Sequence, residues 1–171
     1  MHHFAALRTD RLQLDAVAMT DLDDFHRLHS DPATYEHAPH VRHPDVEHSR
    51  TVLQEWIEDW LLVGLGYYSV RSISGDYLGC GGVRRNQVNF NVYYRLFPHA
   101  WGHGYAQEII RASGPLAERI ERGAILQAVI RPVNVASIAV VERLGMIACG
   151  RQLDYTGAEQ LVYQLPAAEL G

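Results

Sequence analysis

The sequence predicts one domain with a mixed, mostly antiparallel β-sheet flanked by helices, an α/β (α+β) fold. Of its 171 residues, 47% are hydrophobic and 20% are charged, which is the composition of a globular domain with one sizeable core. Three strand-like runs separated by short turns occupy the middle of the chain and favour antiparallel pairing. The last run leads through a glycine-rich turn into a helix and a further strand, an order that implies a parallel pair with a right-handed crossover. We therefore expect residues 1–171 to form a single domain.

The first third of the chain is expected to hold one strand followed by two or three helices. Apolar residues in the segment 7–14 predict the first strand. Thr20, followed by Asp23, fits a helix cap with an acidic first turn, and Pro32 ends this helix because the residue before a proline avoids the helical conformation. A short helical turn is expected near residues 34–37.

A longer helix is predicted after Asp45, which can cap its first turn. Gly64 and Gly66 end this helix. Its apolar residues recur with the helical period and predict a buried stripe. The stripe consists of Val52, Leu53, Trp56, Ile57, Trp60 and Leu61.

The three central strands are predicted at residues 67–73, 77–84 and 88–97. The first two flank a Ser-Gly-Asp sequence at residues 74–76, which is a hairpin signal. The third follows a turn at residues 85–87. These strands are therefore expected to form an antiparallel meander.

The last part of the chain alternates between helix and strand. A helix is predicted within residues 109–120, kinked or interrupted where Pro115 follows Gly114. A buried strand, a helix that ends at Gly145 and a closing hairpin come after it. These elements are predicted at residues 124–131, 134–144, 147–154 and 160–165.

The turn before that first helix, WGHGYAQE at residues 101–108, has the features of an anion site. Gly102 and Gly104 let a ligand approach the backbone, and the N–H groups at a helix start lack intrahelical partners and carry the positive end of the helix dipole. A phosphate or pyrophosphate is the natural ligand, and a tight turn without a ligand is the alternative. Gln107 replaces the third glycine of GxGxxG, and the chain has no P-loop sequence, so both of these nucleotide sites are disfavoured.

Four segments resemble the GNAT N-acetyltransferase superfamily, and most of all its branch of ribosomal-protein N-terminal (Rim-type) acetyltransferases. They match the branch's opening TeRL strand, its liGxxGl strand, its acetyl-CoA pyrophosphate loop WGkGyAtE and its NxxSxxvxEklGF helix. In this chain they are LRTDRL at 7–12, YLGCGGV at 77–83, WGHGYAQE at 101–108, and NVAS with ERLGM at 134–137 and 142–146. His103, where a lysine is common, and Pro115 inside the helix depart from the pattern.

The resemblance implies the GNAT fold, in which the sheet is splayed between the fourth and fifth strands and the pantetheine arm of the cofactor lies in the gap. It implies acetyl-CoA as cosubstrate, no metal, and transfer of acetyl to a primary amine. The acceptor would be the N-terminal α-amine of a protein or peptide, or a small-molecule amine. The residues that the resemblance places at the cofactor are Leu96, Trp101, Gly102, His103, Gly104, Tyr105, Ala106 and Asn134.

Direct attack on acetyl-CoA needs a neutral amine, an anion site for the carbonyl oxygen and a proton for the leaving thiolate. The resemblance places the Ser137 hydroxyl near the sulfur as the proton donor, whereas the residues alone also fit a plain helix cap formed by Asn134 and Ser137. The resemblance places a late carboxylate of some family members near Thr156, where Asp154 and Glu159 are the nearest carboxylates, and Asp154 is the candidate base. Asp154 also fits a solvated turn, and a water relay without a dedicated base is the alternative.

The resemblance implies that the first helices and their connecting loop border the acceptor site, so Tyr35 is expected there. Asn91 and Tyr93, which alternate on one face of the fourth strand, are expected to line the same pocket. Tyr93 fits ordinary core equally well.

Histidines gather in the first third of the chain, at His26, His29, His37, His40 and His43. Imidazole suits zinc or nickel, but Pro39 and Pro44 interrupt the segment and no cysteine supports it, so we expect no metal site. Most of these histidines are expected on the solvated surface, with substrate recognition or amine deprotonation as the alternative.

The net charge of −5 argues against broad nucleic-acid binding. Cys80 and Cys149 are too few for a disulfide scaffold, which favours the reducing cytosol. No signal-peptide core occurs in residues 1–10, and the apolar run at 60–65 is too short to span a membrane. We therefore expect a cytoplasmic monomer or homodimer without nucleic-acid or membrane partners.

Two other functions fit the same residues. The lack of an obvious base fits an acyl-CoA-binding sensor that does not turn its ligand over. The glycine-rich turn also fits a dinucleotide enzyme such as a reductase, although the missing third glycine counts against it.

Overall fold

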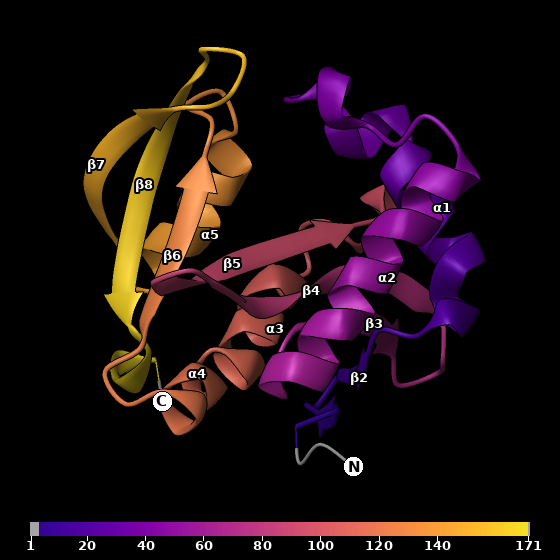
Figure 1. The fold of residues 1–171 in the computed structure, drawn as a ribbon, viewed down its shortest axis with the longest axis horizontal. Helices are drawn as coiled ribbons and strands as arrows, with labels where there is room; N and C mark the ends of the chain where they lie inside the picture. The colour runs from indigo at the N-terminus through magenta and orange to yellow at the C-terminus, as the bar shows by residue number, and fades with distance from the viewer. Residues whose placement is uncertain (1–3, 171) are drawn as a thin grey trace.

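The computed structural model describes residues 4–170, which form one eight-stranded sheet with helices packed against it (Figure 1). The strands lie in the order β1-β2-β3-β4-β5-β6-β8-β7, and all neighbours are antiparallel except β5 and β6. The strands are β1 (Ala6–Arg8), β2 (Leu12–Ala16), β3 (Tyr67–Ser72), β4 (Tyr77–Asn86), β5 (Asn89–Leu96), β6 (Ile125–Ile130), β7 (Ile147–Leu153) and β8 (Glu159–Pro166). The helices are α1 (Leu22–Ser30), α2 (Val46–Val63), α3 (Tyr105–Ser113), α4 (Pro115–Ile120) and α5 (Val135–Arg143). The mixed, mostly antiparallel sheet expected from the sequence is confirmed.

β5 and β6 are parallel but pair over a very short stretch. Phe90 pairs with Leu126 and Asn91 with Gln127, and beyond these residues the two strands diverge (Figure 1). β6 pairs instead with β8 along its whole length. The splay expected between the fourth and fifth strands is therefore confirmed, between the strands labelled β5 and β6.

The shift in strand number arises at the start of the chain, where the prediction of one strand over residues 7–14 is wrong. β1 and β2 form an antiparallel hairpin in which Leu7 opposes Leu14. Thr9 closes the turn, because its N–H donates to the carbonyl of Leu12 at 3.0 Å and its Oγ1 accepts from the Leu12 N–H at 3.0 Å. The apolar residues of the segment are Leu7, Leu12 and Leu14, and these three positions alone did not reveal the turn between the first two.

The predicted helix cap at Thr20 is also wrong. A short 3₁₀ turn precedes α1, and the carboxylate of Asp21 accepts from the Ala18 N–H at 3.0 Å. The same carboxylate accepts from Ser69 Oγ at 2.7 Å and pairs with Arg71 Nη2 at 2.5 Å. Both partners belong to β3, so contacts with the sheet determine that Asp21, and not Thr20, is the polar residue that holds the start of this helix.

The helix ends predicted from glycine and proline residues are confirmed. Gly64 ends α2 with a φ of 75°, a left-handed conformation that suits glycine. The Gly114–Pro115 step separates α3 from α4.

Helices α1 and α2 pack against each other and against β4, while α3 packs on β4 and β5. Trp56 and Trp60 of α2 are buried, and Trp60 Nε1 donates to the carbonyl of Tyr67 at 2.8 Å. Leu61, which was expected in the buried stripe, is 68% exposed, so the stripe is narrower than predicted. Between residues 4 and 170, no helix is long and apolar enough to cross a membrane.

Replacing Trp60 with alanine is expected to lower the free energy of unfolding by about 3–5 kcal/mol, because it leaves a cavity and removes the donor to Tyr67. Urea denaturation measures this loss. Leu62→Ala is the control on the same helix, because Leu62 is 83% exposed and its truncation should change stability by less than about 0.5 kcal/mol. Equal losses in the two variants would contradict the assignment of Trp60 to the core.

Candidate active site

The turn between β5 and α3 presents a row of free backbone donors. Gly102 and Gly104 have φ angles of 75° and 77°, a left-handed conformation that other residues rarely adopt. Within residues 4–170, the N–H groups of residues 102–107 donate to no protein acceptor. Because α3 begins at Tyr105, the positive end of its dipole lies at the same place. The turn therefore has the geometry of a phosphate site.

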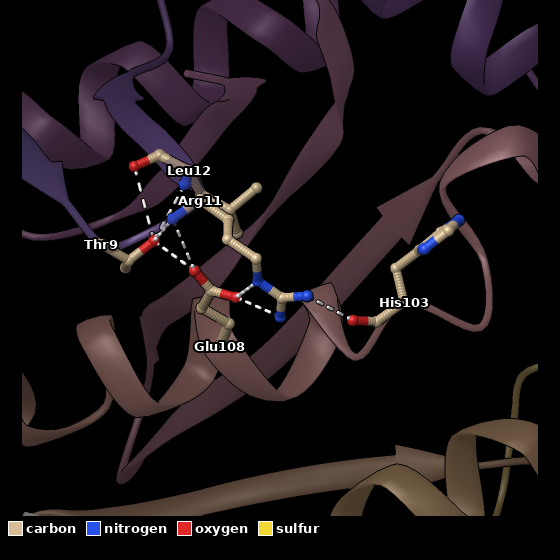
Figure 2. A network of polar contacts seen from close by, with 5 residues as sticks. All are labelled: Thr9, Arg11, Leu12, His103 and Glu108. Atoms are coloured by element: carbon tan, nitrogen blue, oxygen red, sulfur yellow. Dashed lines mark hydrogen bonds and ion pairs between the residues drawn. The ribbon is translucent and has the colours of Figure 1, made fainter. Parts of the chain in front are cut away.

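A polar network from the start of the chain holds this turn (Figure 2). Arg11 donates from Nε and Nη2 to Glu108 Oε2 at 2.8 and 2.5 Å, and from Nη1 to the carbonyl of His103 at 2.9 Å. Thr9 Oγ1 donates to the other carboxylate oxygen of Glu108, which also accepts from the Arg11 N–H at 3.3 Å. The Arg11 guanidinium lies over the ring of Tyr105, 4.8 Å from its centre. The β1–β2 turn thus fixes the position of the glycine-rich turn.

A cleft of about 610 Å³ runs from the glycine-rich turn into the gap between β5 and β6. Its lining includes most of the predicted cofactor residues, namely Leu96, Trp101, Gly102, Gly104, Tyr105, Ala106 and Asn134. His103 is not part of the lining, and its ring stacks on that of Tyr105 with centres 5.5 Å apart.

A family model described as an acetyltransferase (GNAT) domain matches residues 11–147. This chain belongs to the GNAT acetyltransferase family. The general reaction of the family is acetyl transfer to an amine, and the match includes Arg11, Glu108 and the glycine-rich turn.

The individual proteins that resemble this chain share limited sequence identity with it or match only part of it. Uncharacterized protein YkkB of Bacillus subtilis (strain 168) is 38% identical over 77 residues, which are 43% of this chain and 45% of YkkB. The match thus spans less than half the length of that curated relative. An acetyltransferase structure from Agrobacterium tumefaciens has a TM-score of 0.78 at 24% identity, covering 94% of this chain and 93% of its own. RimL, a ribosomal alpha-N-protein acetyltransferase in complex with coenzyme A, has a TM-score of 0.81 at 17% identity, covering 96% of this chain and 99% of its own. At these identities the two structures show the shared fold.

The first turn of α5 lines the cleft of this GNAT domain. Asn134 Oδ1 accepts from the Ser137 N–H at 3.1 Å, so Asn134 caps the helix, as one of the two alternatives held. Both residues nevertheless line the cleft. The carbonyl of Ser137 accepts from the Tyr94 hydroxyl at 3.3 Å, a bond that links α5 to β5 across the gap. Capping the helix and facing the cleft are therefore compatible for Asn134.

Asp154 lies in the turn between β7 and β8 and does not line the cleft. Its Oδ1 accepts from Thr156 Oγ1 at 2.5 Å, the Thr156 N–H at 2.8 Å and the Ala158 N–H at 3.0 Å, and its Oδ2 pairs with Arg131. These hydrogen bonds, with that from the Thr156 hydroxyl the strongest cause, hold the pKa of the Asp154 carboxyl well below its usual value. A carboxylate with so many donors is a poor base, so its geometry does not fit the predicted catalytic role.

Of the predicted acceptor-pocket residues, Tyr35 and Tyr93 line the cleft and Asn91 does not. Asn91 Nδ2 donates to the hydroxyl of Tyr67 at 2.6 Å, so this amide holds a buried tyrosine in place. The Tyr93 hydroxyl accepts from Arg95 Nε at 2.9 Å. Tyr93 is therefore both packed in the core and exposed to the cleft.

Sequence reasoning missed Arg95, which lines the cleft beside Tyr93. Its guanidinium lies 3.6 Å from the centre of the Tyr35 ring. A signal was present, because the alternation that places Asn91 and Tyr93 on one face of the strand places Arg95 there as well.

Most of the five histidines were expected on the surface, but two of them are buried in the core. His29 and His43 are 1% and 6% exposed, and their rings stack with centres 4.7 Å apart. His29 Nδ1 lies 2.9 Å from the carbonyl of Phe25, so Nδ1 carries the proton and Nε2 accepts from the Tyr93 hydroxyl at 3.1 Å. His43 Nδ1 lies 2.8 Å from Ser49 Oγ. In the described part of the chain, no three His, Cys, Asp or Glu side chains come together as a possible metal site.

These buried imidazoles predict acid sensitivity. Burial lowers the pKa of His43 from 6.5 to about 4 and holds the pKa of His29 well below 6.5. Between pH 6.5 and pH 4 the imidazoles of the unfolded chain bind protons that the buried imidazoles do not. The free energy of unfolding is therefore highest above pH 6.5 and falls as the pH drops toward 4. We expect urea denaturation to show a loss of about 2–4 kcal/mol between pH 7 and pH 5 from the two imidazoles together. His43→Gln should make this dependence shallower and leave the part due to His29, and an unchanged slope would contradict the assignment.

Proposed function

We propose that this GNAT domain belongs to the Rim-type branch and transfers acetyl from acetyl-CoA to a primary amine. The acceptor is the N-terminal α-amine of a protein or peptide, or a small-molecule amine. The cleft carries the proposal, because it joins the free N–H groups of residues 102–107 to the gap between β5 and β6. A phosphate site next to an unpaired strand edge suits a long ligand with a pyrophosphate at one end and amides along its arm.

In this proposal the turn binds the pyrophosphate and the β5 edge near Leu96 binds the pantetheine arm. Trp101 connects the turn to the strand, because its Nε1 donates to the carbonyl of Leu96 at 2.8 Å. Asn134 contacts the arm through its amide nitrogen, and the Ser137 hydroxyl donates a proton to the leaving thiolate. A thiol with a pKa of about 8.5 leaves tolerably well unaided, so the contribution of Ser137 is modest.

The amine attacks in its neutral form after losing its proton to solvent water. Support comes from the lining of the cleft, which contains no aspartate or glutamate in the described part of the chain. Asp154, the nearest predicted base, is paired with Arg131. The same feature favours a second candidate function, an acyl-CoA-binding sensor without turnover.

A thermal melt with acetyl-CoA, CoA and NADPH in separate samples tests the ligand class. A ligand at about 100 times its Kd stabilises the folded state by about 2.7 kcal/mol, which shifts the Tm by a few degrees. We expect shifts with acetyl-CoA and CoA and none with NADPH. A shift with NADPH alone would favour a dinucleotide enzyme, and no shift with either CoA ligand would contradict the proposal. Thiol release from acetyl-CoA with a panel of primary amines then separates an enzyme from a sensor.

Replacing Gly104 with alanine is expected to raise the Kd for acetyl-CoA about tenfold. Gly104 has a φ of 77°, a conformation that costs an alanine about 1–2 kcal/mol, and relief of this strain moves the N–H groups of the turn. Isothermal titration calorimetry measures the change. Gly157→Ala is the matched control, since Gly157 has a φ of 82°, open space around an added Cβ and no place in the cleft lining. Equal Kd values for the two variants would contradict the assigned phosphate site.

A further inference from the structure

Arg95, near the end of β5, is a partly buried cation without a carboxylate partner. Its Nε donates to the Tyr93 hydroxyl at 2.9 Å, and its Nη1 donates to the carbonyl of Thr34. Its guanidinium stacks on the ring of Tyr35. Across residues 4–170, no aspartate or glutamate oxygen lies within 4.0 Å of its nitrogens. A charge held in this way is costly unless something compensates it.

The free part of this guanidinium is accessible from the cleft. An arginine has five N–H donors, of which Tyr93 and Thr34 use two, so three are left. Arg95 lines the cleft, and its Nη2 is not sealed from solvent. A planar edge of N–H donors on a partly desolvated cation is the geometry that binds a carboxylate through two parallel hydrogen bonds.

The surroundings of Arg95 in the cleft are also free of acidic residues. The described lining includes three arginines and no aspartate or glutamate, although the whole chain has 20 acidic and 15 basic residues. Arg131 is neutralised by Asp154. Arg143 forms no ion pair with a described carboxylate, but it belongs to the end of α5, across the gap from β5. Arg95 is therefore the unpaired cation on the side of the cleft formed by β5 and the segment after α1.

We propose that the acceptor of the reaction is an amine that also carries a carboxylate, and that Arg95 binds this carboxylate. The inference rests on the proposed acetyl transfer and names the substrate class for it. Arg95 contacts Thr34 and Tyr35, which follow α1, whereas the free N–H groups for the cofactor phosphates lie at the start of α3. A polycationic amine would meet like charge and no acidic side chain, so this cleft discriminates against it.

Isothermal titration calorimetry on the protein saturated with CoA measures acceptor binding without turnover. Two acid–amide pairs serve as probes, β-alanine with β-alaninamide and the peptide amide Ala-Glu-Ala-NH₂ with Ala-Gln-Ala-NH₂. We expect the acid of at least one pair to bind at least about tenfold more tightly than its amide, because the amide leaves the Arg95 donors poorly paired. The pair that shows the preference distinguishes a small-molecule acceptor from a peptide acceptor. Spermidine is expected to bind more weakly than either acid.

Arg95→Gln removes the charge and is expected to abolish the preference for the acid while leaving the Kd for CoA unchanged. Arg95→Lys keeps the charge but not the planar fork, so it should retain part of the preference. Arg122→Gln is the matched control, because Arg122 is exposed and lies outside the cleft lining, and it should keep the full preference. In turnover assays, the ratio of kcat/KM for acid over amide should fall toward one in Arg95→Gln.

Equal binding of acid and amide by the unmodified protein would overturn this inference and leave acetyl transfer intact. An equal loss of both in Arg95→Gln would also overturn it, because it would show that Arg95 acts on the shared amine or on the structure. Weaker CoA binding in Arg95→Gln would assign Arg95 to the cofactor instead. Failure of the unmodified protein to bind CoA would be a different result, which contradicts the proposed function itself.

Discussion

The architecture of the site depends on where the parallel pairing of β5 and β6 stops. It ends after two residue pairs, so the rest of β5 has a free edge inside the fold. Buried backbone groups require partners, and an edge of this kind must be satisfied by water or by a ligand. Side chains link the two walls, since the Tyr94 hydroxyl donates to the carbonyl of Ser137 and Arg131 donates to the carbonyl of His37 at 3.3 Å. The cleft therefore arises from an interrupted β-ladder whose walls are linked by side-chain hydrogen bonds.

A second constraint acts at the end of this cleft that the glycine-rich turn forms. Glu108 lies in the first turn of α3, where a carboxylate is favoured by the helix dipole but would repel a phosphate bound at the same helix start. Arg11 resolves this conflict, because its guanidinium pairs with Glu108 and also binds the carbonyl of His103. In the sequence, Arg11 and Glu108 belong to two separate motifs, LRTDRL at 7–12 and WGHGYAQE at 101–108. The structure shows that they form a single unit that shapes the turn and neutralises its carboxylate (Figure 2).

Features set by local chemistry were predictable, and features set by distant partners were not. Glycine and proline ended helices and formed turns at the expected places, because few other residues adopt the required backbone conformations. Residues 7–14 resembled one strand, since the contacts that fold them into a hairpin include Glu108, far along the chain. At the site, the glycines identified the turn from the sequence alone. Arg95 and Asp154 were different, because the function of each depends on whether another element supplies a partner for its charge.

The charges in the cleft also bear on how an amine can react without a dedicated base. A nearby carboxylate would stabilise the ammonium form and raise the pKa of a bound amine, whereas a nearby cation lowers it. The commitment of Asp154 to Arg131 removes the nearest predicted carboxylate from the cleft, and Arg95 adds an unpaired positive charge. In the proposed complex Arg95 pairs with the carboxylate of the acceptor, and this pairing offsets the negative charge that would otherwise stabilise the ammonium form of the same molecule. In the proposed mechanism, a lining without a described aspartate or glutamate does not hold the amine in its ammonium form, and the proton passes to water through the cleft.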